Sequence, residues 1–144
     1  MRRWNVRLTA TMAMAMAMAA CGGPAAPEAG PLRGGVLATF TVGRETFRVW
    51  VRNPRAIEDL LALQRGTSTA SIPNGLLRAG AGQGSHNTPY SWHLDADEIQ
   101  MADATIEVCD GAPSYVQEHR DEFIATVGRY CPWGARLAGL EDFR

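Results

Sequence analysis

The sequence has no lysine, only three cysteines and a single long hydrophobic run, and each shortage narrows the class of protein. All fourteen basic residues are arginine. No two cysteines form a Cys-x-x-Cys pair, the spacing typical of redox motifs and of cysteine-rich zinc sites. The hydrophobic run lies at the N-terminus, and no later run approaches the about 20 apolar residues that a transmembrane helix needs.

Basic residues are also scarce relative to acidic ones beyond the N-terminal run. From Cys21 onward, eleven arginines stand against fifteen acidic residues, which gives a formal charge of −4. Nucleic-acid affinity depends on clustered basic side chains that neutralise phosphates, and the sequence has no such cluster. The composition therefore argues against a nucleic-acid binder.

The first 20 residues have the composition of a signal peptide. Three arginines in the first seven residues precede an apolar run from Leu8 to Ala20. Cys21 follows directly, and the segment resembles a bacterial lipoprotein signal, in which such a cysteine is acylated. This resemblance implies lipidation of Cys21 and attachment of the exported protein to a bacterial membrane. The alternative is ordinary cleavage, which would leave the protein freely secreted or periplasmic.

The remaining chain divides into a spacer and one domain. Residues 21–35 are dominated by glycine, proline and alanine, a composition that cannot form a core and is typical of a flexible tether. Residues 36–144 have the length of a single folded domain. We therefore predict a signal peptide over residues 1–20, a tether over 21–35 and one domain over 36–144.

The domain begins with a predicted β-hairpin. Residues 36–42 and 45–51 are rich in strand-forming side chains, and glycine first in the two-residue loop Gly43-Arg44 is typical of a type II′ turn. This turn places Val42 opposite Glu45. It gathers six apolar residues on one face: Val36, Ala38, Phe40, Phe47, Val49 and Val51. We expect the opposite face, which carries Trp50, to be the more solvated one.

Two helices are predicted further along the chain. The first follows Asn53, a favourable N-cap, with Pro54 at the first helical position. The second covers residues 113–128, where Ser114 and Gln117 have the spacing of a capping box. Both segments carry apolar residues at helical spacing and end at a glycine.

Further strands are predicted over residues 71–77, 90–94 and 105–109. Glycine and serine crowd residues 80–88, which indicates an exposed loop. A hairpin, two helices and several strands indicate an α+β domain with a mainly antiparallel sheet.

Cys109 and Cys131 lie at the end of a predicted strand and just after a predicted helix, so they are candidates for one disulfide in an oxidising compartment. Closing this loop would contribute roughly 3 kcal/mol in the chain-entropy treatment. The alternative is a redox or metal role, which the absence of a third cysteine in the folded part disfavours.

Four ordered blocks in the second half of the domain resemble a known family. The blocks are Trp92-His93-Leu94-Asp95, then residues 101–111, then Pro113-Ser114-Tyr115-Val116, and finally Tyr130-Cys131-Pro132-Trp133. They are similar to the N-terminal domain of a eukaryotic calmodulin-binding protein and its small exported bacterial relatives. The resemblance implies the same fold and the same disulfide. It does not imply calmodulin as a partner, because neither predicted helix is basic and amphipathic.

A metal site is one functional hypothesis for these blocks. His93 and Asp95 lie close to Asp97 and Glu98, so nitrogen and oxygen ligands are abundant. Glu107, on the predicted strand 105–109, could meet His93 across strands. The bland alternative is that the acidic residues shape a turn while His93 makes a structural hydrogen bond.

The aromatic residues offer a second hypothesis. Trp92 and Trp133, with Tyr90 and Tyr130 nearby, could form a recognition surface, although such residues more often fill the core of a small domain. Burial of both tryptophans would exclude the recognition surface.

The sequence contains no nucleophile elbow, phosphate-binding loop or catalytic triad pattern. We therefore predict a non-enzymatic, exported, membrane-tethered binding module without a cofactor, whose partner is an envelope protein or small molecule. The alternatives are a metal-binding protein or metal-dependent hydrolase centred on His93 and Asp95, and an exported protease inhibitor acting through the glycine-rich loop.

Overall fold

The structure is a computed structural model that describes residues 30–144. The predicted signal peptide, Cys21 and most of the predicted tether lie outside these residues. The strands are β1 (Val36–Val42), β2 (Glu45–Val51), β3 (Ile72–Ala79), β4 (Trp92–Leu94), β5 (Gln100–Ala102), β6 (Arg129–Tyr130) and β7 (Ala135–Asp142). The helices are α1 (Pro54–Gln64), α2 (Pro113–Glu118) and α3 (Arg120–Glu122), with short helical turns η1 (Gln83–Ser85), η2 (Glu107–Cys109) and η3 (Phe123–Val127).

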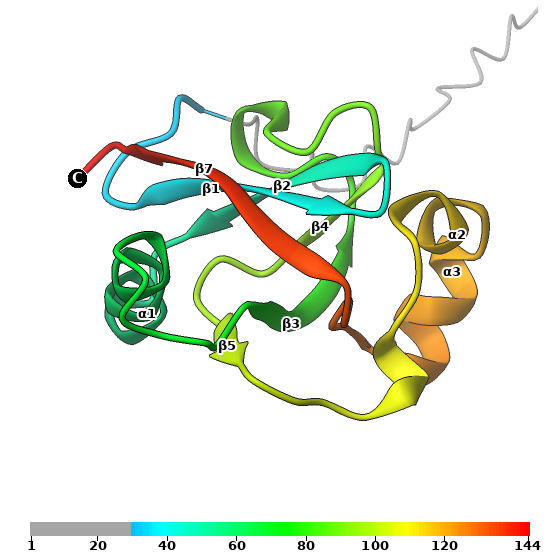
Figure 1. Cartoon of the computed structure of the whole chain (residues 1–144). Coiled ribbons are helices and arrows are strands. Elements are labelled where there is room, and N and C mark those ends of the chain that lie inside the picture. Colours follow the sequence, from blue (N-terminus) through cyan, green and yellow to red (C-terminus); the bar gives the residue numbers. More distant parts are fainter. Residues whose placement is uncertain (1–29) are drawn as a thin grey trace, which may run out of the picture.

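The strands form two antiparallel sheets, which confirms the predicted α+β fold. One sheet has the order β2-β1-β7, and in the other β3 pairs with β4, β5 and β6. Figure 1 shows α1 at one side of the sheets and α2 with α3 at the other. Within the described residues, no helix has the length and apolar character needed to cross a membrane.

The predicted hairpin is confirmed in register. Val42 pairs with Glu45, Phe40 with Phe47, and Val36 with Val51. Gly43 has a φ of 60°, and Ser85 is the only described non-glycine residue with a positive φ, as expected for a type II′ rather than a type I′ turn. The turn is local in sequence, so its chemistry alone fixes the pairing of fourteen strand residues.

The prediction that the opposite face of the hairpin is the more solvated one is wrong at its centre. Trp50 is 1% exposed, and Leu37 beside it is also buried. The chain end covers them: the ring of Phe143 meets Trp50 edge-on at 5.9 Å, and Gly34 and Gly35 are hydrogen-bonded to the backbone of Phe143. This cover comes from segments about 100 residues apart, and the hairpin sequence itself carries no sign of it.

Three aromatic rings join the two sheets. Phe47 from β2 lies 5.9 Å from Trp92 of β4 and 5.5 Å from Tyr130 of β6, and the latter two rings are 5.2 Å apart. All three side chains are at most 1% exposed. The core therefore lies between the sheets.

Helix α1 confirms the predicted capping. The side chain of Asn53 accepts hydrogen bonds from the backbone N–H groups of Arg55 and Ala56, and Pro54 occupies the first turn. The second predicted helix is present but interrupted at His119, where φ is −111°. Its second half continues as α3 and the π-helical turn η3 and ends at Gly128 in the left-handed conformation.

The capping box predicted from Ser114 and Gln117 is wrong. Glu45, at the start of β2, accepts hydrogen bonds from both the backbone N–H and the hydroxyl of Ser114, at 2.7 and 2.8 Å. Gln117 instead accepts from the backbone N–H of Ser91 at 2.7 Å. The first turn of α2 is thus capped by a residue distant in sequence.

Strands β3 and β4 confirm the predictions over residues 71–77 and 90–94 within two residues. The predicted strand over residues 105–109 is wrong, because this segment forms the 3₁₀ turn η2 instead. The loop over residues 80–88 is only partly exposed, since His86 and Asn87 are buried. Strands β5, β6 and β7 were not predicted.

Candidate functional site

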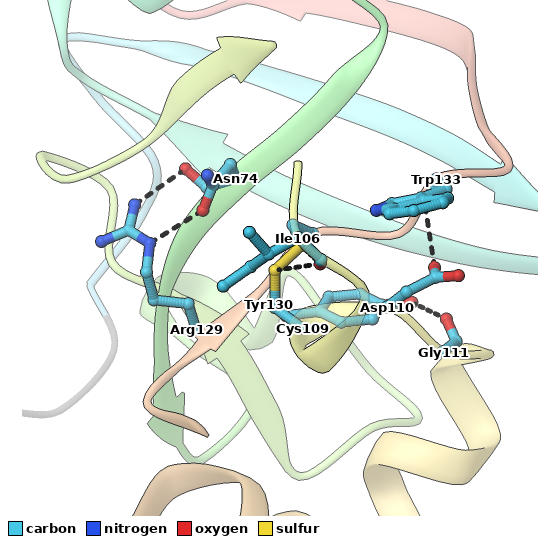
Figure 2. The surroundings of a disulfide bond; sticks show 9 residues. Asn74, Ile106, Cys109, Asp110, Gly111, Arg129, Tyr130 and Trp133 are labelled. Atoms are coloured by element: carbon cyan, nitrogen blue, oxygen red, sulfur yellow. Dashed lines mark hydrogen bonds between the residues drawn. A yellow bond between two sulfur atoms is a disulfide. The ribbon is translucent and has the colours of Figure 1, made fainter. Parts of the chain in front are cut away.

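The disulfide predicted between Cys109 and Cys131 is present. The two Cα atoms are 5.2 Å apart, and the backbone N–H of Cys131 donates to the carbonyl of Cys109 at 2.8 Å. Figure 2 shows how the bond joins η2 to the segment after β6, with Sγ of Cys109 3.3 Å from the carbonyl oxygen of Ile106. Both cysteines are buried.

The two tryptophans proposed as a recognition surface have different environments. Trp92 is 0% exposed and belongs to the core. Trp133 is 43% exposed, and its backbone N–H donates to the carboxylate of Asp110 at 2.8 Å, a contact drawn in Figure 2. The recognition hypothesis is therefore wrong for Trp92 and remains open for Trp133.

Tyr130 is also a core residue. Its hydroxyl donates to the carbonyl of Gly111 at 2.9 Å (Figure 2), so the buried phenol is satisfied. Burial, with a smaller contribution from the charge of Asp110, raises the pKa of Tyr130 far above its ordinary value. Tyr130 therefore acts as a neutral anchor for the loop that follows η2.

Two apolar side chains near the disulfide are exposed, although nothing in the sequence indicates it. Ile106 is 68% exposed and Val108 is 58% exposed. Both flank Glu107 in the segment that was predicted to be a strand, where they would have faced a partner. The alternation of apolar and polar residues is the same for a strand and for this turn, so periodicity could not distinguish them. We call Ile106, Val108 and Trp133 the rim surface.

A groove begins at the rim surface. Trp133 lines one end, and the groove continues along residues 134–139 opposite Leu63 and Gln64 at the C-terminal end of α1. Its volume is about 580 Å³. The groove therefore follows the outer edge of β7.

His93 and Asp95, the centre of the metal hypothesis, are each engaged elsewhere. Nδ1 of His93 is 2.8 Å from the carbonyl oxygen of Gly80. The carboxylate of Asp95 accepts two hydrogen bonds from Arg78, at 3.1 and 3.2 Å, and one from the backbone N–H of Asp97. Among residues 30–144, no three histidine, cysteine, aspartate or glutamate side chains come together to hold a metal ion.

Glu107 does not meet His93, which corrects the expectation of a cross-strand pair. His93 pairs with Arg78 near the C-terminal end of β3. Glu107 lies on η2, whose Cys109 packs against Ile72 at the opposite end of β3. The six residues of extended chain from Ile72 to Arg78 correspond to about 20 Å.

Ser91 has the contacts of a structural residue. Its hydroxyl accepts hydrogen bonds from Arg120 at 2.8 Å and from Gln117 at 2.9 Å. This network ties α2 and α3 to the start of β4, and no histidine belongs to it.

The protease-inhibitor alternative rests on an exposed loop, and the loop is anchored at its centre. Asn87 accepts from the backbone N–H of Arg48 and donates to the carbonyl of Trp92, both at 2.8 Å. Inhibition of proteases stays a prediction for the remaining loop residues.

Comparison with known proteins places the chain beside one family. The model of the N-terminal domain of calmodulin-binding protein 74 matches residues 35–143, nearly the whole described chain. No curated protein and no solved structure matches.

Proposed function

Because the chain belongs to the family of the N-terminal domain of calmodulin-binding protein 74, we propose that it uses this domain as a non-enzymatic binding module, exported from the cell and tethered to a membrane. The partner is a protein of the cell envelope that offers an apolar surface to Ile106, Val108 and Trp133.

The observation that carries this proposal is the exposure of the rim surface. Burying a side chain of this kind stabilises a protein by about 1.5–3 kcal/mol, and here three of them remain largely in solvent. The disulfide and the bond from Trp133 to Asp110 hold their backbone in place, so little ordering is needed on binding. A preorganised apolar surface is typical of a protein-binding site.

The polar groups that could serve catalysis are committed to structural contacts. Asp95 is bonded to Arg78, His93 to Gly80, and Ser91 to Gln117 and Arg120. These contacts favour a binding module over a hydrolase. We assign none of these residues a catalytic role.

Export and tethering rest on the N-terminal sequence. The arginine-led apolar run and the cysteine that follows support processing at Cys21, and a structural disulfide is most often found in an oxidising compartment. Feeding cells a labelled fatty acid tests the anchor. The wild-type chain should incorporate the label and sediment with membranes, whereas a Cys21→Ser variant should do neither. Equal labelling of both would contradict lipidation of Cys21.

Capture from an envelope extract tests binding. The wild-type protein should retain a partner that the double variant Ile106→Ser/Val108→Ser loses. Tyr115→Ser is the matched control, because Tyr115 is also an exposed apolar side chain, 49% exposed on α2, outside the rim surface. If the double variant captured the same proteins as the control, the rim surface would not be the binding site.

A further inference from the structure

The outer edges of the sheet β2-β1-β7 differ. On β2, the backbone N–H of Arg48 is bonded to the side chain of Asn87, and that of Arg52, just after β2, to the carbonyl of Ala96. On β7, the outward backbone groups of residues 136–142 have no partner within the described part of the chain. The groove beside residues 134–139 leaves this edge open. An open edge is a template for pairing with another strand.

A β-bulge changes which side chains of β7 share a face. Thr39 pairs with Gly139 and Phe40 with Leu137, so Ala138 is an extra residue without a counterpart on β1. In a regular strand, residues five apart point to opposite faces. With the extra residue, Arg136 and Glu141 lie on the same face of the sheet.

The hydrogen-bonding pattern of β1 identifies the backbone groups at the open edge. A two-residue turn makes its flanking residues a hydrogen-bonded pair, so alternate residues of β1 starting from Val42 bond to β2, and the others bond to β7. Arg136 and Glu141 pair with residues of the second kind and therefore face β1. Leu137 and Leu140 direct their backbone groups outward.

We infer that β7 pairs antiparallel with β7 of a second copy, which joins the two sheets around a twofold axis. With Leu137 of one copy opposite Leu140 of the other, both pairs of outward backbone groups are matched. In the same register Arg136 lies opposite Glu141 of the second copy, and symmetry makes this ion pair twice. The bulge is what makes the strand complementary to itself.

The surroundings of the edge fit this pairing. The ion pairs within the described chain involve neither Arg136 nor Glu141, so both charges are available. Phe143, 38% exposed after the end of β7, would lie opposite Gly134 of the second copy, where no side chain obstructs it. The dimer goes beyond the proposed function: it would present two rim surfaces at opposite ends of the joined strands, giving a bivalent module.

Analytical ultracentrifugation of the protein purified from cells that express the full chain, in density-matched detergent, tests the dimer. Arg136→Glu and Glu141→Arg should each weaken dimerisation by about tenfold or more, because each variant replaces two attractive pairs by two repulsive ones. The double variant Arg136→Glu/Glu141→Arg should restore dimerisation to near the wild-type level.

Arg44→Glu is the charge-matched control, since Arg44 is exposed in the hairpin turn away from β7. It should leave the association constant unchanged. A wild-type protein that stays monomeric at all concentrations would overturn the inference, as would a double variant no better than the single ones. Partner capture through the rim surface is measured separately, so either idea can fail alone.

Discussion

His86 is a histidine that the fold holds in its neutral form. It is 3% exposed, and its Nδ1 lies 2.9 Å from the carbonyl oxygen of Gln83. A Cβ on Gly82 would lie 2.1 Å from the imidazole, so glycine is required there. Burial, together with the charges of His93 and Arg48, lowers the pKa of His86 to about 4.

This pKa predicts a pH-dependent stability. The unfolded chain binds a proton on His86 near the ordinary pKa of 6.5, whereas the folded chain does so only near 4. The free energy of unfolding should therefore be fully maintained above pH 6.5 and fall as the pH drops toward 4, by on the order of 2–3 kcal/mol. Urea unfolding across this range should show a flatter profile for His86→Gln. Identical pH profiles for both proteins would exclude His86 as the cause.

Asn87 is a second buried polar residue with a defined task. Asn87→Ala would leave the backbone N–H of Arg48 and the carbonyl of Trp92 without partners. We expect a loss of about 2–3 kcal/mol in the free energy of unfolding, measured by denaturant titration. Gln100→Ala, at an exposed position of β5, should cost well under about 1 kcal/mol. Equal losses for both variants would contradict the role of Asn87.

At the scale of elements, the parts of the fold that could be predicted are those whose signals are local. The turn at Gly43-Arg44 determines the hairpin register, and Asn53 with Pro54 determines the start of α1. Strand β7 was missed because its partner β1 lies about 100 residues earlier, and no short-range pattern records such a pairing. The same reason explains the cap on α2.

That cap gives a prediction for the joint between the hairpin and α2. Glu45→Ala removes the acceptor for the N–H and hydroxyl of Ser114 and should lower the free energy of unfolding by about 1–2 kcal/mol. The amide protons of α2 should also exchange faster. Glu58→Ala on the exposed face of α1 is the control and should change neither quantity appreciably. Normal exchange in α2 of Glu45→Ala would contradict the cap.

For the whole molecule, the disulfide links the recognisable sequence blocks to the candidate site. The pairing and the relevance of Trp133 could be predicted from the sequence, whereas Ile106 and Val108 could not, because their exposure depends on η2 replacing a strand. The core position of Trp92 follows from its packing against Phe47 and Tyr130 of other strands.

Removal of the disulfide should therefore affect stability and binding together. The variant Cys109→Ser/Cys131→Ser frees a loop of 22 residues and should lose roughly 3 kcal/mol in the free energy of unfolding. Partner capture should fall even under conditions in which the variant is fully folded. Capture that matched the wild-type level would show that the rim surface does not need the bond.

Oxidative footprinting tests the central claim, that the rim surface binds a partner in the envelope, most directly. Trp133 and Ile106 should react readily in the purified protein and be several-fold protected in intact envelopes, while Tyr115, exposed on α2, reacts equally in both. Comparison at concentrations with the same oligomeric state keeps self-association from producing the difference. Equal reactivity of Trp133 and Ile106 in the two settings would contradict a bound partner at this surface.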